Sequence, residues 1–253
     1  MKRTIYIALT FLALTLFAIP QRGIESARYL VFSDDGSAIP SASEYIQDGL
    51  VAMWDGIENV GWDTHDSDST VWVNLVDGGY FALGESHVFG SDRLIAQANS
   101  PEVQYSMPFA GYDNRTMEVA AQVPDTGYSQ IRVMGLSGGG DSIYATWVAN
   151  GNIAFRTRAH TSSTEVWQGK VSAVNGFTAT LSRDYSKNLR FFYINGELGI
   201  SSSGAYESPS GYVFLPVAKT DIYYFNIRIY NRALTAEEVA HNHLIDRLRF
   251  NLP

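Results

Sequence analysis

The stretch IYYFNIRIYNRALTAEEV, residues 222–239, decides the fold of this chain. Its first half alternates between two sets of side chains. Because successive side chains of a strand point to opposite faces, this pattern predicts a strand over residues 220–232, with one face in the core and one in solvent. The two sets are Tyr223, Phe225, Ile227 and Ile229, and Tyr224, Asn226, Arg228 and Tyr230.

The second half of the stretch predicts a helix. Thr235 is followed three residues later by Glu238, which is the spacing of a capping box at a helix N-terminus. Apolar residues then recur at helical spacing, and Arg247 and Arg249 suit the negative end of the helix dipole. We expect one helix over residues 236–248, packed beside the sheet.

The residues upstream predict a succession of short strands joined by tight turns. Asn-Gly pairs occur at 150–151, 175–176 and 195–196, and such pairs favour two-residue hairpin turns because both central residues need positive φ. Short strands at this spacing predict an all-β sandwich or barrel. The expected strands cover residues 49–54, 69–76, 116–123, 129–136, 141–149, 152–158, 164–167, 176–182, 189–195, 211–215 and 220–232.

Three motifs resemble laminin-G-like domains of the concanavalin A-like lectin and glucanase superfamily, in its bacterial and phage members. They are FNIRIYNRALTAEEV at 225–239, LRFFYING at 189–196, and GLVAMW at 49–54 followed by WVNL at 72–75. The resemblance implies a two-sheet antiparallel jelly-roll sandwich over residues 49–253 with one C-terminal helix. This superfamily includes lectins, adhesion and protein-binding modules, and glycosidases, so the fold does not decide the function.

The composition is that of an acidic chain without cysteine. The 253 residues include 18 Lys and Arg against 26 Asp and Glu, for a formal charge of −8. A nucleic-acid-binding surface needs a basic footprint, so nucleic acid is not an expected partner. The lack of cysteine excludes disulfides, thiolate metal sites and thiol catalysis.

The N-terminal residues 1–27 are typical of an export segment. A basic start, Met1-Lys2-Arg3, precedes a nearly unbroken apolar run over residues 4–20. We expect a cleaved signal peptide, or alternatively a retained anchor that would be the only contact with a membrane. Residues 28–48 are expected to form a partly ordered lead-in segment. The folded part would then be secreted or at the cell surface, or alternatively associated with a virion.

The sequence does not favour catalysis. Glycoside hydrolysis needs two carboxylates flanking the sugar bond, and the hydrolases of this fold present them as E-x-D-x-x-E on one strand. No such triplet occurs here, and Glu118 is the single acid of the predicted strand 116–123. We therefore expect a protein that is not an enzyme. The remote alternative is a glycosidase that uses Glu118.

Calcium is the one cofactor that the sequence leaves open, although the expected function requires none. Asp63, Asp66 and Asp68 lie together in an acidic loop, and Asp141 follows a run of three glycines. Calcium prefers such oxygen ligands but needs six to eight of them. The alternative interpretation is that both segments are solvated turns.

Carbohydrate binding remains the expected function, because sugars stack on aromatic rings and hydrogen-bond to arginine and amide side chains. For each aromatic candidate a place in the core is the favoured interpretation, whereas Arg156 and Arg158 share a strand face that is hard to bury. We expect an exported, non-catalytic carbohydrate-binding or adhesion module whose partner is a glycan or a surface protein. The alternative is a structural or protein-interaction domain without a sugar site. The candidate ligand-binding residues are Trp147, Arg156, Arg158, Trp167, Tyr193, Tyr224, Asn226 and Arg228.

Overall fold

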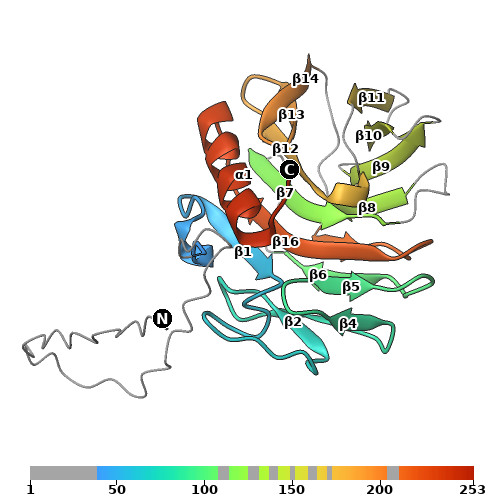
Figure 1. Ribbon diagram of the computed structural model, residues 1–253. Helices are drawn as coiled ribbons and strands as arrows, with labels where there is room; N and C mark the ends of the chain where they lie inside the picture. The colour runs from blue at the N-terminus through green and yellow to red at the C-terminus, as the bar shows by residue number, and fades with distance from the viewer. Residues whose placement is uncertain are drawn as a thin grey trace, which may run out of the picture.

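The computed structural model describes residues 39–107, 114–124, 131–136, 142–148, 152–158, 164–169, 173–203 and 211–253 (Figure 1). For residues 142–148, 152–158 and 164–169 it describes the backbone. The expected export segment, residues 1–27, lies outside these ranges. Within the described part of the chain, no helix is long and apolar enough to cross a membrane.

The larger sheet has eight strands and is antiparallel in every pairing. Its central strand is β16 (Ile222–Tyr230), which pairs with β7 along one side and with β5 and then β1 along the other. The order across the sheet is β14 (Glu197–Ser203), β13 (Leu189–Ile194), β12 (Phe177–Asp184), β7 (Arg115–Gln122), β16, β5 (Leu94–Ala96) and β4 (His87–Phe89), with β1 (Leu50–Asp55) beside β16.

The second sheet has six strands and packs against the first. A two-stranded ribbon and two short 3-10 helices complete the described part, together with one α-helix, α1 (Ala236–Phe250). The second sheet runs β11 (Thr164–Gly169), β10 (Asn152–Arg158), β9 (Ser142–Val148), β8 (Ile131–Leu136), β15 (Tyr212–Leu215) and β6 (Val103–Ser106); the ribbon is β2 (Val71–Val73) and β3 (Tyr80–Ala82), and the 3-10 helices are η1 (Ala42–Glu44) and η2 (Ala173–Asn175). The predicted antiparallel jelly-roll-like sandwich with a C-terminal helix is confirmed.

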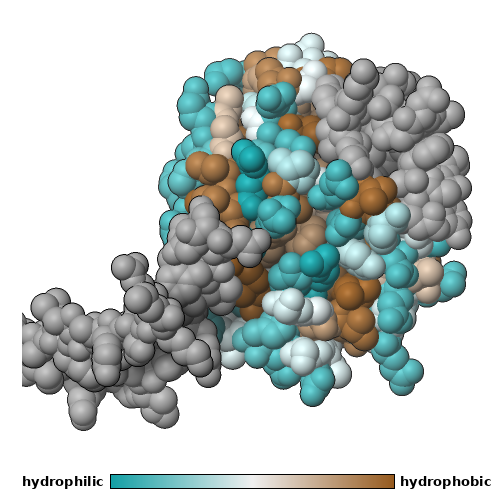
Figure 2. All heavy atoms as spheres, in the orientation of Figure 1, coloured by the Kyte–Doolittle hydropathy of each residue, from teal (hydrophilic) through white to brown (hydrophobic). Residues whose placement is uncertain are grey.

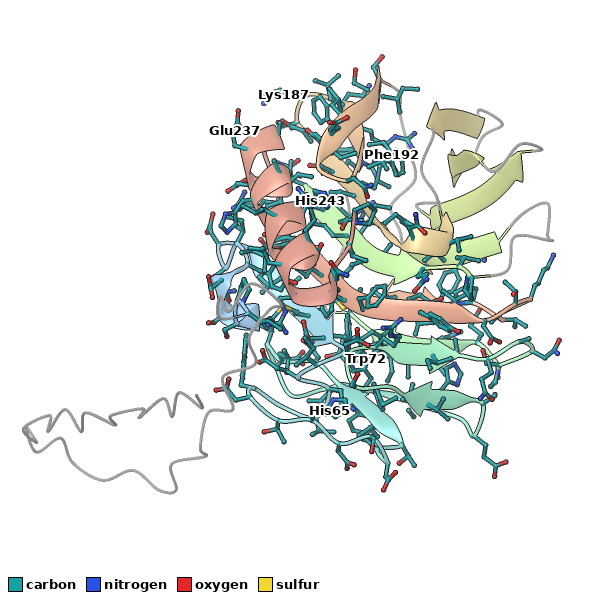
Figure 3. All side chains as sticks on the ribbon, viewed as in Figure 1. His65, Trp72, Lys187, Phe192, Glu237 and His243 are labelled. Carbon is teal, nitrogen blue, oxygen red and sulfur yellow. The ribbon has the colours of Figure 1, made fainter. Side chains whose placement is uncertain are left out.

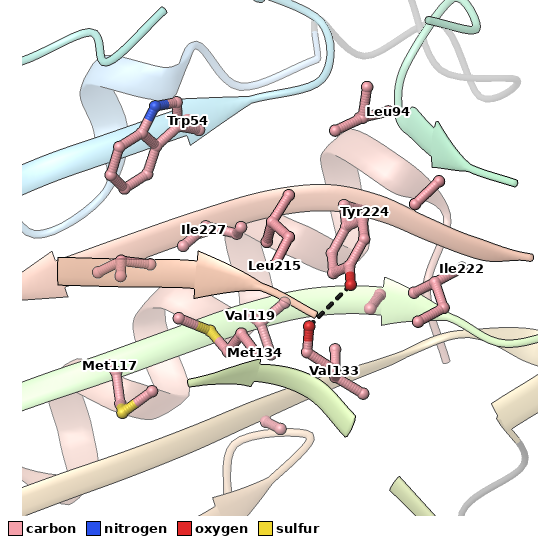
Figure 4. Close-up of a cluster of buried hydrophobic side chains, with 14 of the residues drawn as sticks. Trp54, Leu94, Met117, Val119, Val133, Met134, Leu215, Ile222, Tyr224 and Ile227 are labelled. Carbon is pink, nitrogen blue, oxygen red and sulfur yellow. Dashed lines mark hydrogen bonds between the residues drawn. The ribbon is translucent and has the colours of Figure 1, made fainter. Parts of the chain in front are cut away.

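The core lies between the two sheets. Apolar side chains from β7 and β16, such as Val119 and Ile227, meet Val213 and Leu215 from β15, and all are fully buried (Figure 4). Burying a side chain of this kind contributes roughly 1.5–3 kcal/mol. One hydrogen bond also joins the sheets inside this core, because the Tyr224 hydroxyl donates to the backbone carbonyl of Val133 at 2.7 Å.

A β-bulge in β16 corrects the predicted assignment of its two faces. The ladder with β7 shifts register between Tyr224 and Asn226, so Phe225 is the extra residue. A bulge turns the side chains that follow it by one position. Tyr224 therefore lies in the core with Ile227, whereas Phe225 lies on the opposite face and packs against Phe250 of α1, with ring centroids 5.3 Å apart.

The opposite face of β16 is covered rather than solvated, which corrects the expectation that it faces solvent. Helix α1 lies across this side of the larger sheet (Figure 1). The predicted capping box is present: the Glu238 amide donates to Thr235 Oγ1 at 3.3 Å, and the Thr235 amide donates to Glu238 Oε2 at 2.9 Å. The helix runs two residues beyond the predicted end and stops where Asn251 adopts a left-handed conformation, with φ of 52°.

Replacing Tyr224 by Phe tests the hydrogen bond between the sheets. The substitution keeps the buried ring but leaves the Val133 carbonyl without its donor, so we expect the free energy of unfolding to fall by about 1–3 kcal/mol. The neighbouring Tyr223 is half-buried, and Tyr223→Phe is the matched control, with an expected change under about 0.5 kcal/mol. Urea unfolding measures both, and equal effects of the two substitutions would contradict the assignment.

Candidate functional site

The covered face of the larger sheet contains a buried ion network centred on Arg228. Its Nε donates to Glu118 Oε2 at 2.9 Å, and its two terminal nitrogens donate to the Asp246 carboxylate at 2.7 and 2.8 Å. All three side chains are completely buried. The Tyr45 ring lies over the guanidinium at 4.1 Å, and its hydroxyl donates to Asp246. Strand β7, strand β16, α1 and the lead-in segment therefore meet at this one charge.

Glu118 is engaged entirely inside this network. Besides Arg228, it accepts hydrogen bonds from the Thr180 hydroxyl at 2.9 Å and the Asn242 amide at 2.7 Å. Burial raises the pKa of Glu118, and the Arg228 charge opposes that rise. A side chain enclosed in this way cannot contact a sugar, so the glycosidase hypothesis that rests on Glu118 is wrong.

A second buried ion cluster holds the C-terminal end of α1. Arg249 Nη2 donates to Asp55 Oδ1 at 2.7 Å and lies 3.3 Å from Glu58 Oε1. The other oxygen of Asp55 accepts from the Asn226 amide at 2.9 Å. Residues 39–48 close the face beside the helix, because the Ile46 amide donates to Asn242 Oδ1 at 3.0 Å.

Half of the predicted ligand-binding residues belong to this covered face or to the core. Tyr224, Asn226 and Arg228 are completely buried, and Tyr193 is 4% exposed and packs with apolar residues of β16 and α1. The expectation that these four residues contact a ligand is corrected by their burial, which α1 and the lead-in segment cause.

The three acids of the acidic loop do not form a group that could hold a metal ion. Asp63, Asp66 and Asp68 are all exposed, and Asp66 Oδ1 accepts the backbone amide of Asp68 at 2.9 Å, as in an Asx turn. Among the residues that the structure describes, no group of three or more His, Asp or Glu side chains could hold a metal ion. Asp141 lies outside the described residues.

The outer face of the six-stranded sheet is the remaining candidate site. In β15, Val213 and Leu215 lie in the core, so Tyr212 and Phe214 alternate onto the outer side. The ladder continues this side across the sheet: Arg132 pairs with Tyr144, and Tyr144 pairs with Arg156. We call these alternating outer positions the arginine face: Gln104, Ser106, Tyr212, Phe214, Arg132, Gly135, Ser142, Tyr144, Thr146, Val148, Asn152, Ala154, Arg156, Arg158, Thr164, Val166 and Gln168.

Three of the strand positions that make up the arginine face hold arginine, and none of them holds Asp or Glu. Its charged residues are Arg132, Arg156 and Arg158, and the other positions are polar, aromatic or small. Trp147 and Trp167 are opposite Ile153 and Phe155 in the ladder, at positions that alternate with those of the arginines. Of the eight predicted ligand-binding residues, the register thus places Arg156 and Arg158 on this face.

Side-chain contacts are described at one end of the arginine face. The half-buried Arg132 guanidinium lies over the Phe214 ring, 5.4 Å from its centroid. The Tyr212 ring meets Phe214 edge-on at 6.2 Å, and Gln104 and Ser106 on the neighbouring strand are exposed. Sequence reasoning missed Arg132, Tyr212 and Phe214, because nothing local shows that β8, β9 and β15 lie side by side.

Histidine 243 is a buried titratable group at the interface of α1 with the larger sheet (Figure 3). Its Nδ1 lies 3.1 Å from the Thr178 hydroxyl, which in turn donates to Asp246. Burial lowers the pKa of His243 below its ordinary value of 6.5; the Asp246 charge opposes this, whereas Arg247 and Arg228 add to it. Protonation of this ring therefore costs folding free energy.

Comparison with known proteins identifies the fold and goes no further. No protein-family model matches the chain, and no curated protein matches it. Solved structures do match. The receptor-binding domain of botulinum neurotoxin D has a TM-score of 0.61 and 9% identity, covering 78% of this chain and 52% of that one. The serotype D ligand-binding domain in complex with N-acetylneuraminic acid has a TM-score of 0.62 and 10% identity, covering 79% and 51%.

A Trypanosoma rangeli sialidase is a further structural neighbour, with a TM-score of 0.59 and 16% identity over 85% of this chain and 35% of that one. The chain spans about half the length of the botulinum chains that it matches. At such low identity the likeness carries the β-sandwich fold and not a sugar site. The laminin-G-like resemblance is a finer statement, which these neighbours do not establish.

Replacing Asp246 by Asn tests the ion network. The change leaves Arg228 with a single carboxylate in a buried site, so we expect the free energy of unfolding to fall by about 3–5 kcal/mol. Asp48→Asn is the matched control, because Asp48 pairs with Arg232 at the surface and is 86% exposed, where such pairs contribute about 0–1 kcal/mol. Chemical denaturation compares the two, and a small loss in Asp246→Asn would contradict the central place of Arg228.

The lowered pKa of His243 predicts a dependence of stability on pH. Because the unfolded state binds the proton more tightly, the contribution of His243 is complete above about pH 6.5 and is lost as the pH falls through the folded-state pKa. His243→Gln removes the titrating group, so we expect its free energy of unfolding to fall less between pH 8 and pH 5.5 than that of the unsubstituted protein. Parallel pH profiles for the two proteins would contradict this.

Proposed function

We propose that this protein is an exported, non-catalytic module that binds carbohydrate through the arginine face. One observation carries the proposal: α1 and residues 39–48 cover the middle of the outer side of the eight-stranded sheet, around β1, β7 and β16, so the outer face of the six-stranded sheet is the broader candidate. That face combines arginines, an aromatic pair, hydroxyls and amides, which are the groups that orient sugars.

The accessible chemistry at the described end of the face supports this proposal. Tyr212 is half-buried and lies beside Phe214, while Gln104 and Ser106 reach solvent on the adjacent strand. Phe214 is only 7% exposed, so Tyr212 is the ring of this pair that can stack on the apolar side of a sugar, while the neighbouring amide and hydroxyl bond the sugar edge. No cofactor is needed for binding of this kind. Export through residues 1–27, to the medium, the cell surface or a virion, belongs to the same proposal.

A protein-interaction domain is the second candidate, and exposed leucines on α1 favour it. Leu244 and Leu248 lie one turn apart on the helix and are 48% and 46% exposed. Over the side of the molecule that Figure 2 shows, however, apolar residues alternate with polar ones. Protein-binding surfaces are usually larger contiguous apolar patches, so the glycan proposal is preferred.

Binding to an array of neutral and acidic polysaccharides tests the proposal. We expect the protein to bind at least one class of glycan, and Tyr212→Ala to weaken that binding about threefold to tenfold through loss of a stacking ring. Tyr80→Ala is the matched control, because Tyr80 is 55% exposed on the separate β2–β3 ribbon, and we expect unchanged binding. Absence of binding to every glycan would instead favour the protein-interaction domain.

A further inference from the structure

We infer that the outward side of α1 is a dimerisation surface, on which α1 of a second copy of this chain packs antiparallel. The inference is independent of the proposed function. The observation behind it is a row of apolar side chains at every fourth position of the helix, all of them exposed. We call this row the α1 ridge: Ala236, Ala240, Leu244 and Leu248.

Helical geometry separates the α1 ridge from the side of the helix that packs on the sheet. Positions four apart lie on one side of an α-helix. The other side carries Val239, Asn242 and Asp246, which are buried against the sheet and the lead-in segment. On the ridge, Leu244 and Leu248 are 48% and 46% exposed. The helix therefore presents large apolar side chains outward, away from the core that it helps to close.

Strand β14 widens the apolar surface beside the ridge. Leu198 of this strand is 54% exposed and pairs with Tyr193, which packs on the side of the sheet that α1 covers. Residues directly opposite each other in a ladder share one face, so Leu198 lies on the same side of the sheet as α1. The hairpin also touches the helix: a β-carbon added to Gly196 would lie 3.3 Å from Ala240 Cα.

The ridge is complementary to itself in size when two copies run antiparallel. In a twofold interface the same surface is used by both copies, so that two positions of one copy meet each other's counterparts on the second. With the axis level with Asn242, Ala240 meets Leu244 of the second copy, and Ala236 meets Leu248. Each leucine then packs on an alanine, which lets the two helices approach closely, because interaxial distance depends on the side chains at the contact. A parallel pair would place leucine on leucine.

The charges beside the ridge are complementary in the same arrangement. Glu237 lies in the first turn of α1 (Figure 3) and Arg247 in the last, and both are exposed. About 15 Å of helix separates them, which is too far for a pair within one copy. The same axis brings Glu237 level with Arg247 of the second copy, at both ends of the contact. Antiparallel helix dipoles add to the attraction. A parallel pair would instead bring like charges together.

The size of the ridge predicts a weak dimer. The ridge is one helix wide and about 20 Å long, which suits a second helix better than a broad protein surface. Contacts of this size belong to the small class of specific interfaces, so we expect a dissociation constant in the micromolar range. Helix α1 lies on the outer side of the larger sheet, and the six-stranded sheet packs on its inner side (Figure 1). Pairing through α1 therefore leaves the outer side of the six-stranded sheet uncovered.

Sedimentation velocity of the full-length protein, from about 1 to about 200 µM, tests the inference. We expect the mass to rise from monomer to dimer over this range. Leu244→Asp places a charge in the contact of both copies, so we expect at least tenfold weaker association. Val217→Asp is the matched control, because Val217 is 59% exposed in the loop before β16, and we expect association within twofold of the unsubstituted protein. If Leu244→Asp is unfolded by circular dichroism, Leu244→Ala replaces it, with an expected loss of at least threefold.

Exchange of charge tests the antiparallel arrangement. Glu237→Arg alone and Arg247→Glu alone each bring like charges together at both ends of the pair. We expect each variant to associate roughly tenfold more weakly than the unsubstituted protein. An equal mixture of the two variants joins an arginine with a glutamate at both ends, so the mixture should regain an affinity within about threefold of the original. Circular dichroism melting checks that each variant is folded before mixing.

Each contrary result identifies the step that is wrong. A protein that stays monomeric over the whole concentration range would overturn the inference and indicate a different partner for the ridge. Association that survives Leu244→Asp would place the contact elsewhere in the chain, for example in the apolar residues 4–20, and would overturn it as well. Charge variants that fail to recover when mixed would contradict the antiparallel pairing. The carbohydrate-binding proposal is unaffected by all three results, because Tyr212→Ala tests it separately.

Discussion

The fold depends on the burial of one charge, the guanidinium of Arg228. It lies in the central strand, away from water, where an unpaired charge would cost several kcal/mol. Glu118 supplies one carboxylate from the neighbouring strand, and Asp246 supplies the other from α1. Satisfying Arg228 therefore requires the helix to lie on this face of the sheet at this position. The Tyr45 ring over the guanidinium brings the lead-in segment to the same point.

This constraint determines where a ligand can bind. A sandwich has two outer faces, and the ion networks of Arg228 and Arg249 commit one of them to the helix. The same networks engage Glu118, Asp246, Asp55 and Glu58, all of which are buried. The acidic groups with the most unusual surroundings are thus structural, and the proposed binding site lies on the six-stranded sheet instead.

Sequence patterns predicted the elements whose signals are local. The capping box of α1 needs only Thr235 and Glu238, and the hairpin after β13 has the expected Asn195 and Gly196 with φ of 49° and 76°. Strands β3, β4, β5 and β6 were missed because three or four residues are too few for an alternation to appear, and β14 was missed although it has seven residues. The bulge at Phe225 and the partners of Arg228 escaped prediction for a different reason. They depend on contacts between segments far apart in the chain, such as Glu118 and Arg228, 110 residues apart.

The candidate site also has one part that a local sequence pattern predicts and another part that depends on the order of the strands. The alternation along one strand is enough to group Arg156 with Arg158, and two charges on one strand face are hard to bury. Only the order of strands adds Arg132, because its ladder neighbour Tyr144 is also the neighbour of Arg156. The strand order also pairs Trp167 with Phe155, one position from Arg156. Trp167, which was predicted to contact the ligand, therefore alternates with the arginines instead of sharing their face. The two arginines that the helix covers, Arg228 and Arg249, are each matched with carboxylates, so they stabilise the fold.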